Sequence, residues 1–449
     1  MMQRRHFLGA AGALPAAALL GSLSGSIDAA GEDFRTLVVV YLNGGNDGNN
    51  TLVPTDAMYN DYQAGRQNLA LPKASLAALA GTAAGHTFGL HPALQPLVGL
   101  YAQQRLSFIA NVGPLVEPCT ARQVLDLAVD LPPFLLSHSD QQAIVQGWTV
   151  TDDNSGWAGR ALELLPSRLQ NRAAAVTMDT NRTLVLGKRS SVSSLSPDGA
   201  SWWGIGDMAR PADVGTQSLV RMAQWQFANA YEAEYARTYG LSINDSIFFT
   251  QAYQNRITPT GDFGPESERL ARNLRGVASM LPYFKSVGLK RQVILLQWGG
   301  FDTHTNQRGS DANTQDSQFA VLAKALKGFD DSNKAAGLDN NVVTLVMTEF
   351  GRTVRPGSGG GSEHAWGNHW MALGGPVNGG TVLGQFPSPV LGGADDGDPG
   401  KNGRHVPTTS VDQVAATLMQ WLGLPSSQFD DVFPWLVNFP GKTIPLLRA

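Results

Sequence analysis

Four continuous runs of apolar residues, rich in β-branched side chains, predict buried strands. An apolar run without polar alternation is typical of a strand covered on both faces, as in a parallel sheet. Three of these runs lead into polar loops that carry acidic or histidine side chains. The runs are Thr36–Leu42, Leu106–Asn111, Val293–Gln297 and Val342–Met347.

Segments whose apolar residues have helical spacing alternate with these strands. This order of strands and helices predicts an α/β fold with a doubly wound, mostly parallel central sheet flanked by helices. Capping residues at the start of a segment and glycine or proline after its end mark the expected helix limits. The expected helices are Pro92–Gln104, one capped by Ser139 or Asp140 that runs through Val145, Ala158–Leu165, one through Phe319–Phe329, and one capped by Thr409 or Ser410 that runs to Leu422.

The middle of the chain departs from this alternation. Residues 181–211 are rich in serine and glycine and show little periodicity, whereas Gln217–Tyr239 and Glu266–Val287 have helical spacing and few helix-breaking residues. We therefore expect a single α/β domain over residues 31–449, with a helical and loop insertion around 181–290.

The first thirty residues have the pattern of an export signal. Arg4 and Arg5 precede a mild apolar run, and the small residues around Ala29 and Ala30 resemble a cleavage site. An uncleaved membrane anchor is the alternative, but glycines and a proline interrupt the run, which falls short of the ~20 apolar residues of a bilayer span. The pattern predicts a twin-arginine signal peptide over residues 1–30. It also predicts the twin-arginine translocase as a partner and a periplasmic or otherwise exported mature protein without a stable membrane span.

Composition excludes some classes of partner and site. The 449 residues are 43% hydrophobic and 16% charged with a formal net charge of -4, which describes an ordinary globular protein and predicts no nucleic-acid partner. Cys119 is the only cysteine, which excludes an intramolecular disulfide and a thiolate metal cluster.

Candidate chemistry follows the ends of the predicted strands, because ligands of open α/β sheets bind beyond the carboxyl ends of the strands. Carboxylates and imidazoles that converge there suit a divalent-metal hydrolase, since such ions take oxygen and nitrogen ligands and acidify bound water. The candidates are Asp47 after the first strand, Asp302 and His304 after the third, Glu349 and Arg352 after the fourth, and His364 and His369 after the glycine-rich segment Gly357–Gly361.

Each candidate also has a purely structural interpretation. Asp47, in a turn rich in glycine and asparagine, fits a residue that bonds its own backbone. Asp302 and His304 fit a salt-bridged loop pair, and Glu349 fits a charged helix start. The two late histidines fit loop residues with satisfied hydrogen bonds. The coincidence of four polar loops, each after a buried run or a glycine hinge, favours the functional interpretation.

Several motifs stand out in addition to the paired arginines. They are LNGGNDGNNTLVP at Leu42–Pro54, SHSDQQ at Ser137–Gln142, GGFDTH at Gly299–His304, MTEFGRT at Met347–Thr353, EHAWGN at Glu363–Asn368 and PTTSVDQVAATLMQWLGL at Pro407–Leu424. In this order they resemble the bacterial family catalogued as domain of unknown function 1501, from about Leu37 to Phe439. That family is grouped with the alkaline phosphatase and sulfatase superfamily, so the resemblance implies an alkaline-phosphatase-like fold.

The resemblance also implies one or two divalent metal ions, of which Zn, Mn, Mg and Ca are the candidates. Asp47 resembles the acid after the first strand that ligates one metal. Asp302 and His304 resemble the acid and the histidine of the other metal site.

Two motifs depart from the superfamily pattern. Glu349 occupies the place of the aspartate in the superfamily's Asp-His-Gly, and Phe350 replaces its histidine, which removes one imidazole ligand. The later acid–histidine pair is Glu363 and His364, where the expected pattern has aspartate. Either His364 or His369 is the late histidine that the resemblance implies.

Ser137 is the candidate nucleophile, because it precedes a predicted helix whose N-terminal dipole would stabilise an alkoxide. Ser139 and Thr51 are alternatives. We do not expect His138 to pair with Ser137, since adjacent residues on an extended segment point apart.

These observations support two hypotheses of different classes. The first is an exported metal-dependent hydrolase of phosphate or sulfate esters, with a small anionic ester as substrate and Arg352 paired with its non-bridging oxygens. The second is a non-catalytic exported binding or assembly protein on the same scaffold, because fold does not fix function. A mononuclear metal hydrolase without a covalent intermediate lies between them.

Overall fold

The computed structural model describes residues 34–147, 154–198 and 214–448, and the statements below concern these residues. The predicted signal peptide and part of the serine-rich and glycine-rich stretch at 181–211 lie outside them. Among the described helices, none combines the length and the apolar composition that a bilayer span requires.

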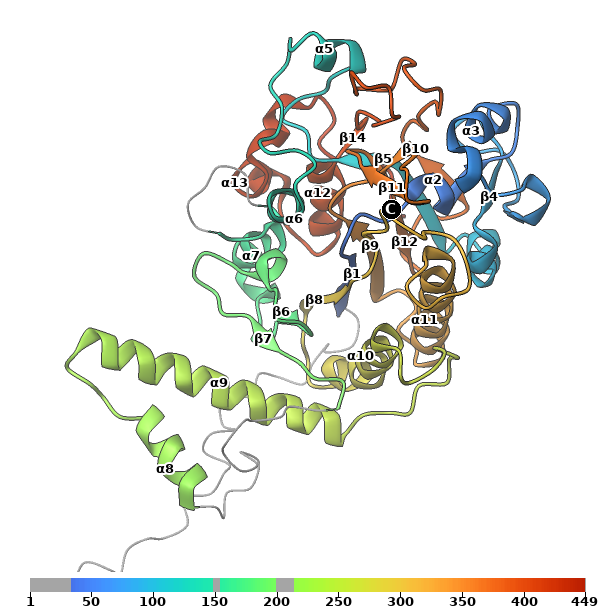
Figure 1. Cartoon of the computed structure of the whole chain (residues 1–449). Helices are drawn as coiled ribbons and strands as arrows, with labels where there is room; N and C mark the ends of the chain where they lie inside the picture. The colour runs from blue at the N-terminus through green and yellow to red at the C-terminus, as the bar shows by residue number, and fades with distance from the viewer. Residues whose placement is uncertain (1–33, 148–153, 199–213, 449) are drawn as a thin grey trace, which may run out of the picture.

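A nine-stranded, mostly parallel sheet forms the centre of the molecule, in the order β13-β5-β12-β9-β1-β8-β6-β7, with β14 also paired to β5 (Figure 1). Strand β12 runs antiparallel to both of its neighbours, and every other pairing in this sheet is parallel. The four strands predicted from the apolar runs are confirmed as β1, β5, β8 and β9. The bounds are β1 Arg35–Leu42, β5 Leu106–Gly113, β6 Ala175–Thr177, β7 Ser193–Ser194, β8 Arg291–Trp298, β9 Val342–Thr348, β12 Asn368–Leu373, β13 Thr381–Leu383 and β14 Thr409–Ser410.

Helices cover both faces of this sheet. Along β1, Val38 and Val40 pack into the core on the face of α10 (Arg269–Ser286) and α11 (Gln315–Ala335). The alternate residues of β1 pack on the opposite face, with α7 (Trp157–Glu163) and α12 (Val411–Trp421). Burying each such side chain contributes about 1.5–3 kcal/mol. Because both faces are covered, the central strands are continuously apolar, as the sequence predicts.

Smaller elements surround this α/β core. Strands β2, β4 and β3 form one small sheet, and β10 and β11 form an antiparallel hairpin. Their bounds are β2 Leu52–Pro54, β3 Ala77–Ala78, β4 Phe88–Leu90, β10 Arg352–Pro356 and β11 Ser362–His364. The short helices are α2 Gly48–Thr51, α3 Tyr59–Arg66, α5 Ala121–Leu125, α6 His138–Val145 and α13 Phe429–Val432, with 3-10 turns at Gln67–Leu69, Lys73–Ser75, Ser167–Leu169, Thr183–Val185, Ser426–Gln428 and Pro434–Asn438.

Some predicted helix limits are confirmed and others are wrong. Ser410 caps α12 in a capping box with Gln413, as expected. The helix predicted over Pro92–Gln104 is instead a 3-10 helix, Pro92–Leu97, followed by α4, Val98–Ala102. Pro96 lies inside this segment and lacks the N–H that an α-helix would use.

The predicted insertion contains two kinds of structure. The single helix expected over Gln217–Tyr239 is wrong, because α8 (Val214–Ala223) ends before Asn229 caps a separate helix α9 (Ala230–Gln254). Helix α8 and the first part of α9 extend away from the body of the molecule (Figure 1). The last part of α9, with Phe248, Phe249 and Ala252, is buried beside α10, which covers the central sheet. Part of the segment between β7 and β8 therefore belongs to the core.

Candidate metal centre

Three imidazoles surround the carboxylate of Asp302, in the loop after β8. His304 Nε2 lies 2.9 Å from Asp302 Oδ1, and His364 Nε2 lies 3.3 Å from the same oxygen. His138 Nε2 lies 3.3 Å from Asp302 Oδ2. The structure therefore brings together three of the residues expected from the sequence, Asp302, His304 and His364, with His138 as an additional member.

The opposite nitrogen of each imidazole has its own hydrogen-bond acceptor. His138 Nδ1 lies 3.0 Å from Glu349 Oε1, and His304 Nδ1 lies 2.8 Å from Glu363 Oε2. His364 Nδ1 lies 2.7 Å from the carbonyl oxygen of Leu136. An acceptor at Nδ1 holds the imidazole proton on that atom and leaves the lone pair of Nε2 directed at the centre.

These lone pairs fit a shared cation. His304 Nε2 and His364 Nε2 lie 3.0 Å apart, but neither atom carries a proton when both rings are neutral and each Nδ1 is the donor. His138 Nε2 is buried and has no hydrogen-bond partner among the described residues. Nitrogen and oxygen ligands about 2.1 Å from one tetrahedral ion are about 3.4 Å apart, close to the separations seen here. The ligand atoms of His138, Asp302 and His364 all lie within 4.8 Å of one another, so these three side chains form a set of donors that one metal ion would satisfy. His304 lies beside this set, against Asp302 and His364.

Two loops meet at this centre through an unusual glycine. Gly44, after β1, has a φ of 114°, and a Cβ there would clash with the main-chain nitrogen of Asp302. Only glycine adopts this conformation readily and permits this approach. Leu136 has a φ of 74°, which is rare for leucine, and this backbone presents the carbonyl that His364 contacts.

Arg352 is placed differently from the expected substrate contact. Its side chain is fully buried and donates to Asp302 Oδ1 at 2.5 Å, to the carbonyl of Gly45 at 2.9 Å and to the carbonyl of Ser362 at 2.9 Å. The guanidinium also bonds to the carbonyl of Gly44. Arg352 therefore joins the loop after β1 to Asp302 and the β10–β11 hairpin, and it does not face a substrate.

Glu349 lies behind His138 and not beside the other ligands. Its carboxylate accepts hydrogen bonds from the main chain of Gly44 at 2.8 Å and from Gln142 Nε2 at 3.1 Å, in addition to His138. With these donors the buried carboxylate orients an imidazole, which is the role of an outer-shell residue in many metal sites.

Asp47 lies outside the cluster. It is fully buried and forms an ion pair with the equally buried Arg66. Its carboxylate also accepts hydrogen bonds from Gln307 Nε2 at 2.5 Å and from the main chain of Asn49 at 3.1 Å, which caps α2. The structural interpretation of Asp47 as a residue that bonds its own backbone therefore fits, and its charge is met by Arg66.

His369 also lies outside the cluster. It is buried in β12, where Nδ1 accepts a hydrogen bond from the main chain of Asn111 at 3.1 Å and the ring stacks on Phe386 at a centroid distance of 4.8 Å. Burial lowers the pKa of His369 to about 3, so the ring is neutral. Of the two late histidines, only His364 contacts Asp302.

The candidate nucleophiles differ in their surroundings. Ser137 occupies the N-cap position of α6, but its side chain makes no capping hydrogen bond, and its hydroxyl donates to Asp140 Oδ2 instead. It stands between Leu136 and His138, both of which contact the cluster. Thr51 is buried and donates to the carbonyl of Asp47, whereas Ser139 is exposed.

Neighbouring charges, hydrogen bonds and burial shift the pKa values of the side chains in the cluster. Partial burial raises the pKa of Asp302, but the hydrogen bond and charge of Arg352 and the nearby histidines outweigh burial and lower the pKa to about 2. The hydrogen bond to Glu349 raises the pKa of His138, whereas burial lowers the pKa of His364. Asp302 is therefore a carboxylate throughout the physiological range.

Sequence reasoning missed His138 as a member of the centre. His138 lies in the SHSDQQ motif, where the sequence suggests only a possible partner for Ser137. Glu363 stands in the sequence as the acidic neighbour of His364. Both residues lie in motifs that also contain candidate residues, and this position in the sequence is the signal that could have indicated their role.

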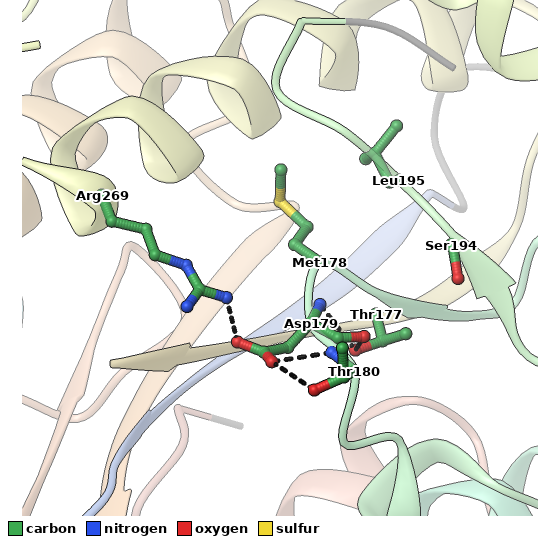
Figure 2. Close-up of a pocket in the computed structure, with 7 residues that line it drawn as sticks. All are labelled: Thr177, Met178, Asp179, Thr180, Ser194, Leu195 and Arg269. Atoms are coloured by element: carbon green, nitrogen blue, oxygen red, sulfur yellow. Dashed lines mark hydrogen bonds and ion pairs between the residues drawn. The ribbon is translucent and has the colours of Figure 1, made fainter. Parts of the chain in front are cut away.

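A separate cavity lies at the ends of β6 and β7 and the start of α10 (Figure 2). It has a volume of about 360 Å³, and Arg269 forms an ion pair with Asp179 across it. None of its lining residues belongs to the histidine cluster. They are Thr177, Met178, Asp179, Thr180, Ser194, Leu195 and Arg269.

Among solved structures, the lipoteichoic acid synthase LtaP from Listeria monocytogenes is similar over 92% of this chain and 78% of its own, at 10% identity and a TM-score of 0.34. The phosphonate monoester hydrolase SpPMH from Silicibacter pomeroyi is similar over 87% of this chain and 74% of its own, at 10% identity and a TM-score of 0.33. Likenesses this weak carry no argument about function. A search of curated protein sequences gives no match. Residues 35–429 match the family described as "Protein of unknown function (DUF1501)", and the chain belongs to that family.

Proposed function

We propose that this protein is a metal-dependent hydrolase of phosphate or sulfate esters, with a single metal ion held by His138, Asp302, His304 and His364. The observation that carries this proposal is the convergence of three imidazole Nε2 atoms on one carboxylate, with every Nδ1 bound to an acceptor. Such oriented imidazoles are typical of metal centres, whose outer-shell acceptors fix each ligand.

One ion fits the donors better than two. Asp47, expected to ligate a metal, is neutralised by Arg66, and Phe350 stands where the superfamily pattern places a histidine. A guanidinium therefore supplies the positive charge beside Asp47. Among the expected ions, three imidazoles favour zinc over magnesium and calcium, which prefer oxygen ligands.

A bound ion would polarise the ester oxygen and lower the pKa of a coordinated hydroxyl or water. In the covalent route, Ser137 Oγ attacks the phosphorus or sulfur atom while Asp140, which accepts its hydrogen bond, takes the proton. The bond to the leaving alcohol breaks, and the alkoxide takes a proton from water. Water then hydrolyses the serine ester and releases the inorganic anion. Attack by water without a serine ester is the mononuclear alternative.

Export is part of the proposal. The paired Arg4 and Arg5 before a mild apolar run support twin-arginine export, and a periplasmic or otherwise exported location would follow. The substrate would then be a small anionic ester outside the cytoplasm.

A non-catalytic binding protein is the second candidate, and one observation favours it. Arg352 lies next to Asp302, but its donors are directed at carbonyl groups and at Asp302. The centre thus lacks the arginine contact to a substrate that the sequence suggested.

Metal analysis of the folded, signal-free protein tests the proposal. We expect one equivalent of zinc, lost in His364→Ala, together with turnover of an aryl phosphate or aryl sulfate. His86→Ala is the matched control, because His86 forms a half-exposed ion pair with Asp56 away from the centre. Zinc without turnover of either ester would support the binding protein. A protein that takes up no metal would contradict the proposed centre.

Single-turnover kinetics separate the two chemical routes. Ser137→Ala should abolish a burst of released alcohol in the covalent route, whereas Ser139→Ala should retain it. Unchanged turnover in Ser137→Ala would indicate direct attack by water.

A further inference from the structure

We infer that the centre selects singly charged esters, meaning sulfate monoesters or phosphate diesters, over the doubly charged phosphate monoester. This inference rests on the proposed function and concerns the charge of the substrate. It follows from the balance of charged side chains around the three imidazoles.

Three carboxylates contact the imidazoles of the centre. Asp302 contacts all three imidazoles directly, and Glu349 and Glu363 lie one imidazole further out, at 3.0 Å from His138 Nδ1 and 2.8 Å from His304 Nδ1. Arg352 is the cation that contacts this set, through Asp302. Asp140, which accepts the hydrogen bond of Ser137, adds a fourth carboxylate beside the proposed nucleophile. Four carboxylates and one guanidinium leave three negative charges, of which a single divalent ion neutralises two.

In the described part of the chain, no further unpaired cation contacts these side chains to meet a second negative charge on the substrate. Arg404 donates to the carbonyl of His364 at 3.0 Å, but its guanidinium is paired with Asp398 at 3.4 Å. Among the described residues, no lysine forms a hydrogen bond or ion pair with His138, Asp302, His304 or His364. A singly charged ester therefore meets a centre with one uncompensated negative charge, whereas a doubly charged ester brings one negative charge more among the carboxylates.

The burial of each carboxylate decides how strongly its charge acts on a bound anion. Glu363 is half exposed and contacts the far side of the His304 ring from Asp302, so solvent screens part of its charge. Glu349 is fully buried, where its field is screened less by water. Like charges brought together at a binding site cost free energy, and this cost disfavours the ligand with the additional negative charge.

Calorimetry on the zinc-loaded, signal-free protein tests the inference without relying on turnover. The ligands are methyl sulfate and dimethyl phosphate, which carry one charge, and methyl phosphate at about pH 8, which carries two. We expect both singly charged ligands to bind at least about tenfold more tightly than methyl phosphate. Equal or tighter binding of methyl phosphate overturns the inference, as does failure of all three to bind.

A charge-removing variant sharpens this test. Glu363→Gln keeps an oxygen that accepts from His304 Nδ1 but removes the charge, so methyl phosphate should gain several-fold relative to methyl sulfate. Glu266→Gln is the matched control, because Glu266 is exposed and paired with Arg275. An unchanged ratio in Glu363→Gln, with zinc content intact, would contradict the role of this carboxylate in selecting the ligand.

The outcomes separate this inference from the proposed function. Selective binding of singly charged ligands without turnover of any aryl ester would uphold the inference and reject the hydrolase. Turnover that is fastest for an aryl phosphate monoester would support the hydrolase and overturn the inference. Of the two singly charged ligands, the tighter one indicates whether the centre binds sulfate esters or phosphate diesters better.

Discussion

The imidazoles of His304 and His364 face each other with their Nε2 atoms 3.0 Å apart, although each ring already donates from Nδ1. Without a cation, this arrangement sets two lone pairs against each other beside Asp302. With a cation, the same geometry becomes favourable. The centre should therefore couple metal binding to the stability of the fold.

Removal of the metal should lower the melting temperature. An ion present at a hundred times its dissociation constant stabilises a folded protein by about 2.7 kcal/mol, so EDTA should lower the transition by several degrees. Addition of zinc should restore it, and calorimetry of the two forms is the measurement. In His364→Ala, EDTA should have little effect, and an equal response there would place the ion elsewhere.

Gly44→Ala should damage the centre without altering any ligand. A methyl group at this position clashes with the main chain of Asp302, and the φ of 114° is strained for alanine. We expect loss of zinc and a destabilisation of several kcal/mol, measured by metal analysis and urea unfolding. Gly81→Ala is the control, since Gly81 also has a positive φ, of 82°, but nothing lies within 4 Å of its Cβ position. It should cost only about 1–2 kcal/mol and leave the zinc in place.

Asp47→Asn should reduce stability but not metal content. The change leaves Arg66 buried without a counter-charge, which costs roughly 3 kcal/mol or more, while asparagine still caps α2. Urea unfolding and metal analysis on the same preparation test both statements. Asp56→Asn, in a half-exposed pair with His86, should cost less than about 1 kcal/mol. Loss of the ion in Asp47→Asn would instead make Asp47 a ligand.

Asp412 should make the fold less stable as pH rises. It is buried in the first turn of α12, its Oδ2 has no hydrogen-bond partner in the described part of the chain, and burial raises its pKa from 3.8 to about 7 against the opposing charge of Arg160. The native state holds this proton more tightly than the unfolded state does. Stability is therefore full below about pH 4 and decreases up to about pH 7.

The corresponding variant is Asp412→Asn, which cannot ionise. It should be more stable than the parent by roughly 1–3 kcal/mol at about pH 8, with little difference at about pH 4. Urea unfolding across this range provides the measurement. Asp431→Asn, at an exposed position of α13, should leave the pH profile unchanged. A parallel displacement of the Asp412→Asn profile at all pH values would reject ionisation as the cause.

The central sheet could be predicted because its signal is local. Strands β1, β8 and β9 are covered on both faces, so their sequences are continuously apolar, and the polar loops after β8 and β9 hold Asp302, His304 and Glu349. The break between α8 and α9 was not predicted, because residues 224–229 contain no proline or glycine to mark it.

The site could be predicted only in part, because its details depend on contacts between distant segments. Nothing near Asp47 indicates that Arg66, on the short helix α3, will neutralise it in the interior. The role of His138 likewise depends on Glu349, which is remote in sequence. His369 follows His364 closely in the sequence, but β12 places it in the interior.

One of the three groups that orient the imidazoles is a peptide carbonyl, that of Leu136. Glu349 and Glu363 can each be deleted by a point substitution, but a carbonyl persists whatever side chain occupies position 136. Random mutagenesis should therefore yield many variants with a disoriented His138 or His304 and few with a disoriented His364. The hardest ligand to disturb by mutation is thus the one secured by the backbone itself.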